Sequence, residues 1–181
     1  MLKTESYIEI RPTSVLLDGQ AIAVQETGSK MLVELYRRYA GDYPKFFKMD
    51  TLSRLGFIAA EILLKQSARS DLNQVSAVIL ANRSASIKND TDYLATISDG
   101  NYYPSPALFV YTLPNIVTGE IAIRHHIQGE TSFYILDNPE QLEPIIKSQI
   151  TNHKSQIILA GWCECSATDE FYAKLQIIWN N

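Results

Sequence analysis

The stretch LPNIVTGEIAIRHHIQGETSFYILDNPEQ, residues 113–141, decides the fold class. Asn115 follows a proline and precedes apolar residues at helical spacing, so we expect it to cap a helix that Gly129 terminates. An apolar strand over 131–136 comes next, and a turn then opens a second helix over 138–153. Helix, strand and helix in direct succession favour an α/β domain.

The segments on either side alternate in the same way. Asp18-Gly19 is a hairpin signal within the N-terminal strands, whereas the polar segment 82–93 predicts a loop. The predicted strands besides 131–136 are 7–10, 15–24, 75–81, 156–165 and 171–180.

Two further helices are predicted, over 30–40 and 50–66. The second is the clearest in the chain, because Asp50 or Thr51 can cap it and its apolar residues recur on one face. Glu61 within it is interpreted as a solvated or paired residue and not as a catalytic one. For the helix that follows Asn115, the expected apolar face is Ile116, Ile123 and Ile127.

This order predicts one layered α/β domain over residues 1–181, with a mixed, mainly parallel sheet and an antiparallel final strand. The composition is 46% hydrophobic and 20% charged, as in ordinary globular domains. A net charge of −4 argues against a nucleic acid partner. No apolar run approaches the roughly 20 residues of a membrane span, and the N-terminus has no apolar signal core. A cytoplasmic protein is the expectation.

No metal centre or cofactor is predicted. Cys163 and Cys165 form a C-x-C pair without a matching CxxC or histidine cluster, so we expect buried thiols in a reducing compartment. His125 and His126 point roughly 100° apart on a helix and do not suit one metal ion. Beside Arg124, they are interpreted as cations favoured near a helix C-terminus.

Three segments, in order, resemble one family. They are YPKFFKMDTLSRLGFIAAE (43–61), SPALFVYTLPNIVTGEIAIRHHIQG (105–129) and SQIILAGWCEC (155–165). Each is similar to a segment of the β-ketoacyl-acyl-carrier-protein synthases, or ketosynthases. The resemblance implies a thiolase fold, in which two βαβαβαββ halves stack as five layers. This chain matches the N-terminal half alone, and the half that carries the family's catalytic histidines has no counterpart in it.

The resemblance also locates the family's nucleophilic cysteine, at the start of the helix that follows the strand 131–136. Counting forward from Gly129 reaches Asn138, and counting back from the 156–165 strand lands nearer Leu136. No residue from 133 to 142 is Cys or Ser, so the resemblance implies no independent catalysis. Asn138 is better explained as a helix cap with Pro139 and Gln141, although the regular helix could also begin at Pro144.

In that family, the region that matches residues 102–111 lies near the acyl site and the subunit interface, and the strand before the nucleophile pairs antiparallel across the dimer. Half of such a fold also leaves one face of its sheet or helix layer uncovered, and burying it would drive association by roughly 25 cal/mol per Å². The candidate interface or pocket residues are Phe109, Tyr111, Asn115, Phe133 and Tyr134.

These inferences favour a non-catalytic accessory subunit in fatty acid or polyketide-type biosynthesis. Its expected partners are a ketosynthase or a second copy of the chain, with acyl carrier protein as a further possibility. The alternative is a composite acyl-processing site, to which this chain contributes pocket residues while a partner chain supplies cysteine and histidine. The partner's identity, the acyl substrate and the oligomeric state stay open at this point.

Overall fold

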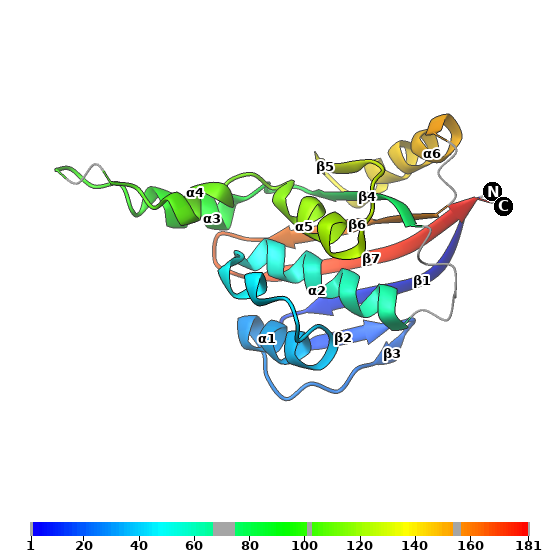
Figure 1. The fold of residues 1–181 in the computed structure, drawn as a ribbon, viewed down its shortest axis with the longest axis horizontal. Helices are drawn as coiled ribbons and strands as arrows, with labels where there is room; N and C mark the ends of the chain where they lie inside the picture. Colours follow the sequence, from blue (N-terminus) through cyan, green and yellow to red (C-terminus); the bar gives the residue numbers. More distant parts are fainter. Residues whose placement is uncertain (1, 67–74, 101–102, 154–156, 181) are drawn as a thin grey trace.

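The computed structural model describes residues 2–66, 75–100, 103–153 and 157–180, and in these residues one mixed sheet organises the chain (Figure 1). The strand order is β3-β2-β1-β7-β6-β4-β5. The strands are β1 (Leu2–Arg11), β2 (Ser14–Leu17), β3 (Gln20–Ala21), β4 (Val75–Asn82), β5 (Thr131–Ile135), β6 (Ile157–Cys165) and β7 (Phe171–Asn180).

Helices lie on both faces of this sheet. The helices are α1 (Gly28–Tyr39), α2 (Thr51–Gln66), α3 (Ile87–Leu94), α4 (Pro106–Val110), α5 (Ile116–His125) and α6 (Leu142–His153), with short 3₁₀ turns η1 (Pro44–Lys48) and η3 (Pro139–Gln141). The main core forms where α1, α2 and α5 pack on one face. A smaller core lies under α6 on the other face. Among the described helices, none is long and apolar enough to span a bilayer.

The α/β class and the mixed sheet are confirmed, but the expectation of a mainly parallel sheet is wrong. Among the described strands, β4 pairs in parallel with β5 and β6, whereas the other four pairings are antiparallel. The reason is that β1, β2 and β3 are joined by tight turns, which only antiparallel neighbours permit. This meander then joins the sheet beside β7.

The predicted strand 15–24 is in fact two strands, because its hairpin signal forms a turn. Asp18 and Gly19 have φ angles of +50° and +80°, as a tight hairpin turn between β2 and β3 requires. The Asp18 carboxylate also accepts hydrogen bonds from the Tyr7 N–H (2.8 Å) and the Ser6 hydroxyl (2.7 Å). The turn is thereby fixed to β1.

α2 is the central helix of the main core, as its apolar pattern predicted. Asp50 accepts a hydrogen bond from the Ser53 N–H (3.0 Å), which confirms a side-chain cap at this end. Glycine at position 56 permits close packing, since a Cβ there would lie 2.4 Å from Val117 of α5. α2 therefore contacts its neighbouring helix closely.

The ends of α5 differ from their predictions. The side chain of Asn115 forms no cap hydrogen bond, and the helix ends at His125 with His126 in the left-handed region (φ +55°). Gly129 lies beyond the helix and approaches β4, where an added Cβ would lie 1.8 Å from the Ser76 carbonyl oxygen. Of the expected apolar face, Ile127 is buried and Ile116 packs against the main core, but Ile123 is exposed. The residues of α5 that are buried are Val117, Thr118, Glu120, Ile121 and Ala122.

The structure of two other segments also differs from the prediction. The predicted loop 82–93 contains most of α3. Asn138 is extended and makes no side-chain cap hydrogen bond, since η3 follows it directly. α6 then begins at Leu142, and Pro144 falls in its first turn, where a helix needs no N–H donor. Gln156, the first residue of one predicted strand, lies outside the described residues.

Candidate functional site

An arm projects from the carboxyl end of β4, away from the sheet (Figure 1). We define the arm as residues 83–100 and 103–114, which include α3 and α4. Polar side chains join its two segments, 83–100 and 103–114. Asn89 donates a hydrogen bond to the Leu108 carbonyl oxygen (2.7 Å), and the Ser86 hydroxyl donates one to the Thr112 carbonyl oxygen (2.7 Å). Both donors are buried, so the arm has an ordered interior of its own.

The surface of the arm is apolar. Ten large apolar side chains are exposed among the described residues, and the arm carries seven of them. These seven are Ile87, Leu94, Ile97, Tyr103, Phe109, Val110 and Leu113. Exposed large apolar side chains gathered on one segment are typical of sites that bind another protein.

The edge of β5 is a second unusual feature. In the described part of the chain β5 pairs with β4 alone, and its other edge is open. The N–H groups of Val78 and Leu136 bond the carbonyls of Glu130 and Asn82 at the two ends of the pairing. With a period of two, the N–H groups of residues 131, 133 and 135 therefore point away from β4. Such an edge can accept a further strand.

The arm and the β5 edge are neighbours. The Leu136 N–H bonds the Asn82 carbonyl oxygen (2.8 Å), which places the end of β5 beside the residue from which the arm departs. Ile135, at the end of β5, is 51% exposed. We name the arm together with β5 the partner surface.

The predicted interface residues divide between this surface and the core. Phe109 is 55% exposed on α4, with its ring 5.5 Å from that of Tyr93, and Asn115 is exposed where the arm ends. Tyr111 is buried in the main core. Phe133 and Tyr134 lie half-buried on opposite faces of β5. Phe133 packs against the main core and Tyr134 against the core under α6.

Sequence reasoning missed other apolar residues of the arm. Leu94, Ile97 and Leu113 were not singled out, although they are among its exposed side chains. The sequence signal for Leu94 and Ile97 was the presence of apolar residues within the otherwise polar segment 88–100.

Leu136, Asp137 and Asn138 form the turn after β5, where the resemblance placed the family's nucleophile. Leu136 is half-buried and packs against the α6 core, and Asn138 is exposed. The Asp137 N–H donates a hydrogen bond to the Gln141 side chain (2.8 Å). The three-residue 3₁₀ turn η3 follows and leads directly into α6.

The two cysteines are buried on β6, as predicted. Burial raises the pKa of Cys163 well above the ordinary thiol value and, with nearby Asp169, that of Cys165 to about 12. Neither thiol is therefore a nucleophile at neutral pH.

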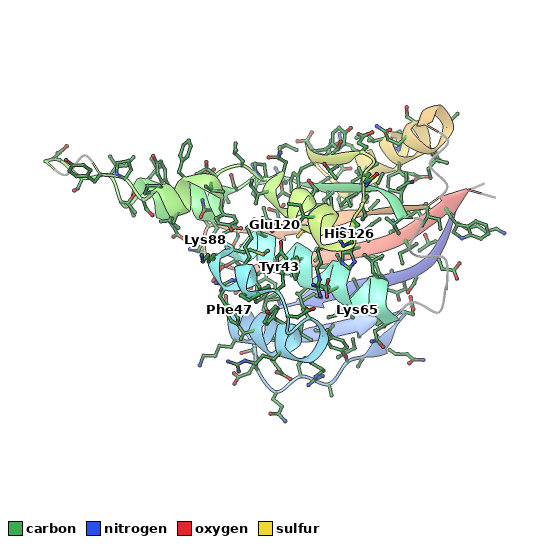
Figure 2. All side chains as sticks on the ribbon, viewed as in Figure 1. Tyr43, Phe47, Lys65, Lys88, Glu120 and His126 are labelled. Atoms are coloured by element: carbon green, nitrogen blue, oxygen red, sulfur yellow. The ribbon has the colours of Figure 1, made fainter. Side chains whose placement is uncertain are left out.

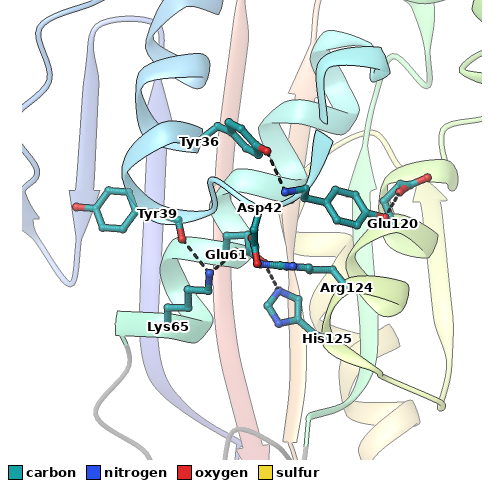
Figure 3. A network of polar contacts seen from close by, with 9 residues as sticks. Tyr36, Tyr39, Asp42, Glu61, Lys65, Glu120, Arg124 and His125 are labelled. Carbon is teal, nitrogen blue, oxygen red and sulfur yellow. Dashed lines mark hydrogen bonds and ion pairs between the residues drawn. The ribbon is translucent and has the colours of Figure 1, made fainter. Parts of the chain in front are cut away.

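A buried ion network joins α2 to α5 (Figure 3). Glu61 is fully buried, and its carboxylate contacts Arg124 Nε (2.9 Å), His125 Nε2 (3.0 Å) and Lys65 Nζ (2.8 Å). Arg124 also pairs with Asp42 at 2.5 Å. Burial raises the pKa of Glu61, but the hydrogen bonds from its three partners outweigh this effect and hold it at about 2.

This network accounts for Glu61 and for Arg124 and His125 near the end of α5. The sequence left open whether Glu61 is solvated or paired, and the structure shows that it is paired. Arg124 and His125 pair with the same buried carboxylate. A second buried carboxylate, Glu120, contacts Lys45 and accepts a hydrogen bond from the Tyr43 hydroxyl (2.9 Å). Both clusters connect helices, and within the described residues no three side chains converge as metal ligands.

The open part of the sheet also differs from expectation. α6 covers β4, β6 and Ile178 of β7, whereas no helix core forms on the same face of β1 and the rest of β7 in the described chain. The resemblance implied an uncovered face of the sheet or of the helix layer, whose burial would drive association. The uncovered area of the sheet carries the polar and aromatic side chains Tyr7, Glu9, Arg11, Tyr172, Lys174 and Gln176, which we name the open half-sheet. Burying this area of the sheet would remove little apolar surface from water.

No protein-family model matches the sequence, and a search of curated proteins gave no match. Solved structures do match. The ishigamide ketosynthase/chain length factor aligns with a TM-score of 0.71 and 14% identity, over 99% of this chain and 62% of that one. A complex of the ketosynthase ApeO with its chain length factor ApeC, from Xenorhabdus doucetiae, aligns with a TM-score of 0.67 and 12% identity, over 99% of this chain and 79% of that one.

A third match is the complex of the type II polyketide synthase acyl-carrier protein AntF with its ketosynthase AntDE, at a TM-score of 0.62 and 12% identity, over 99% of this chain and 62% of that one. The fold of this chain is therefore ketosynthase-like and of the thiolase type, as the sequence resemblance implied. The chain spans about 62% of the length of the first chain that it matches. At these identities the likeness concerns the fold alone.

Proposed function

We propose that this chain is a non-catalytic subunit that pairs with a ketosynthase in fatty acid or polyketide-type biosynthesis. The observation that carries the proposal is the partner surface, which combines seven exposed apolar side chains on the arm with the open edge of β5. A fold shared with ketosynthase and chain length factor complexes supports the choice of partner. A soluble, cytoplasmic location and contact with an acyl carrier protein belong to the same proposal.

The chemistry of the candidate site supports a non-catalytic role. Acyl transfer in ketosynthases needs a nucleophile, and the end of β5 carries leucine, aspartate and asparagine at 136–138. Cys163 and Cys165 are buried with raised pKa values. The carboxylates Glu61 and Glu120 are committed to ion pairs between structural elements.

The geometry of β5 supports pairing by strand addition. A strand from the partner would bond the outward N–H and C=O groups of residues 131, 133 and 135, while the arm covers apolar surface beside it. The opposite edge of the sheet is less suited to this, since β3 has only two residues. The proposal is tested by measuring the affinity of the purified chain for a ketosynthase encoded in the same genome.

Substituting Ile135 with proline is expected to weaken that complex about tenfold, because proline removes one outward N–H donor. Ile135 is 51% exposed and its N–H points away from β4, so the fold should survive. The matched control is Ile135→Ala, which removes most of the side chain but keeps the N–H. Equal affinities of the two variants, measured by titration calorimetry, would contradict pairing through this edge.

A composite acyl-processing site is the second candidate, and one observation favours it. Leu136 and Asn138 follow β5 beside the origin of the arm, so a partner bound at the partner surface would lie near them. If they line a shared pocket, Asn138→Ala should change product formation or chain length in the reconstituted pair. His126→Ala serves as a distant control, since His126 follows the end of α5 that lies away from the origin of the arm (Figure 2). Unchanged products from the Asn138→Ala variant would exclude this candidate.

A further inference from the structure

The open half-sheet is built from side chains that already have partners. Arg11 lies over the ring of Tyr172 (4.6 Å to its centroid) and pairs with Glu9 (2.8 Å). Lys174 lies over the ring of Tyr7 (5.4 Å). Each charge therefore contacts a neighbour on its own or the adjacent strand, and cross-strand and cation–ring contacts of this kind stabilise a solvated sheet face.

These pairs follow from the register of β1 and β7. Glu9 is opposite Lys174, and Tyr7 is opposite Gln176, so charged and aromatic side chains alternate over the two strands. The alternate residues of the same strands, such as Ile8 and Leu175, point to the main core on the other face. Each strand thus has one apolar and one polar side, as in antiparallel sheets with one face in water.

The rim of this face is polar as well. A groove of 430 Å³ separates α6 from β7, with Glu140 and Glu143 on one bank and Lys174 on the other. Its apolar lining residues Leu142, Ile146 and Trp162 are already buried. None of the ten exposed large apolar side chains of the described chain lies on β1, β7 or α6. A protein that covered this face would have to desolvate charges of both signs and would gain little apolar contact.

We infer that the open half-sheet is a water-facing surface which no subunit covers. The inference concerns a surface outside the proposed partner contact. It applies to whatever assembly the chain forms, including a pair of identical chains.

Thiol labelling tests this inference directly. Lys174→Cys places a thiol on the open half-sheet, and Leu113→Cys places one on the arm, where Leu113 is 54% exposed. The native thiols give little background, since Cys163 and Cys165 are buried. The reaction rate with a polyethylene glycol maleimide is measured for the dilute chain, the concentrated chain and the complex with a ketosynthase.

The labelling rate of the Lys174→Cys variant is expected to change less than about threefold between these states, and the chain labelled at position 174 should still assemble. The labelling rate of the Leu113→Cys variant should fall at least about tenfold on assembly. Slower labelling at position 174 in any state, or loss of assembly after labelling there, would overturn the inference. If no ketosynthase binds, the proposed function fails, whereas rapid labelling at position 174 in the concentrated chain still supports a water-facing surface.

Discussion

Replacing Phe109 and Leu113 together with aspartate is expected to abolish binding to a ketosynthase while the chain stays folded. Both side chains are more than half exposed on the arm, so little core packing is lost. Buried aromatic and aliphatic anchors each contribute about 2 kcal/mol or more at protein interfaces, and a charge would also have to be desolvated. The double variant should therefore bind at least about 100-fold more weakly.

A matched pair of single variants controls for the loss of any exposed phenylalanine. Phe109 is 55% exposed on the arm, and Phe47 is 50% exposed on η1, where its ring contacts Tyr36 of α1 (Figure 2). Phe109→Ala should weaken the complex about tenfold in titration calorimetry, whereas Phe47→Ala should change it less than about twofold. The reverse order would place the contact near α1 and not on the arm.

Replacing Glu61 with alanine is expected to lower the free energy of unfolding by about 3 kcal/mol, since it leaves the partly buried side chains of Arg124 and His125 without their carboxylate partner. Arg124 retains Asp42 and 19% side-chain exposure, which limits the loss. For a chain of this size the midpoint of thermal unfolding should fall by about 10 °C. The control is Glu143→Gln, which removes an exposed i,i+4 pair with Lys147 and should move the midpoint by less than about 2 °C.

The same carboxylate makes stability depend on pH. The pKa of Glu61 is about 2 in the folded chain and near 4.5 in the unfolded chain, so its contribution is fully present above pH 4.5 and is lost as the pH falls toward 2. The difference corresponds to about 3 kcal/mol. Denaturant unfolding at pH 7 and pH 3 should show a smaller acid loss for Glu61→Ala than for the original chain. Equal losses would mean that Glu61 is not held ionised by its partners.

The sequence predicted the elements whose signals are local. The apolar run of β4, the capped and periodic α2, and β5 between two helices were all located to within a residue or two. The place of β1 in the sheet was not predictable from local signals, because its partner β7 lies at the other end of the chain. The sheet is mainly antiparallel because the β1–β2–β3 meander joins it through that antiparallel pairing.

The candidate site was predicted in part for a similar reason. Phe109 stood out as an aromatic residue in a stretch rich in proline, and it is exposed on the arm. The helix α3 was missed since its polar residues serve contacts across the arm, such as that of Asn89 with Leu108. The polar character of the open half-sheet was visible in the alternation of β7, where Tyr172, Lys174 and Gln176 intervene between apolar residues.

The most direct test of the central claim is the native mass of the chain, purified alone and then co-expressed with each ketosynthase of its own genome. The proposed function predicts a stable mixed complex with one ketosynthase, which the Phe109→Asp/Leu113→Asp variant fails to form. A chain that stays monomeric, or that pairs only with itself and binds no ketosynthase, would contradict it.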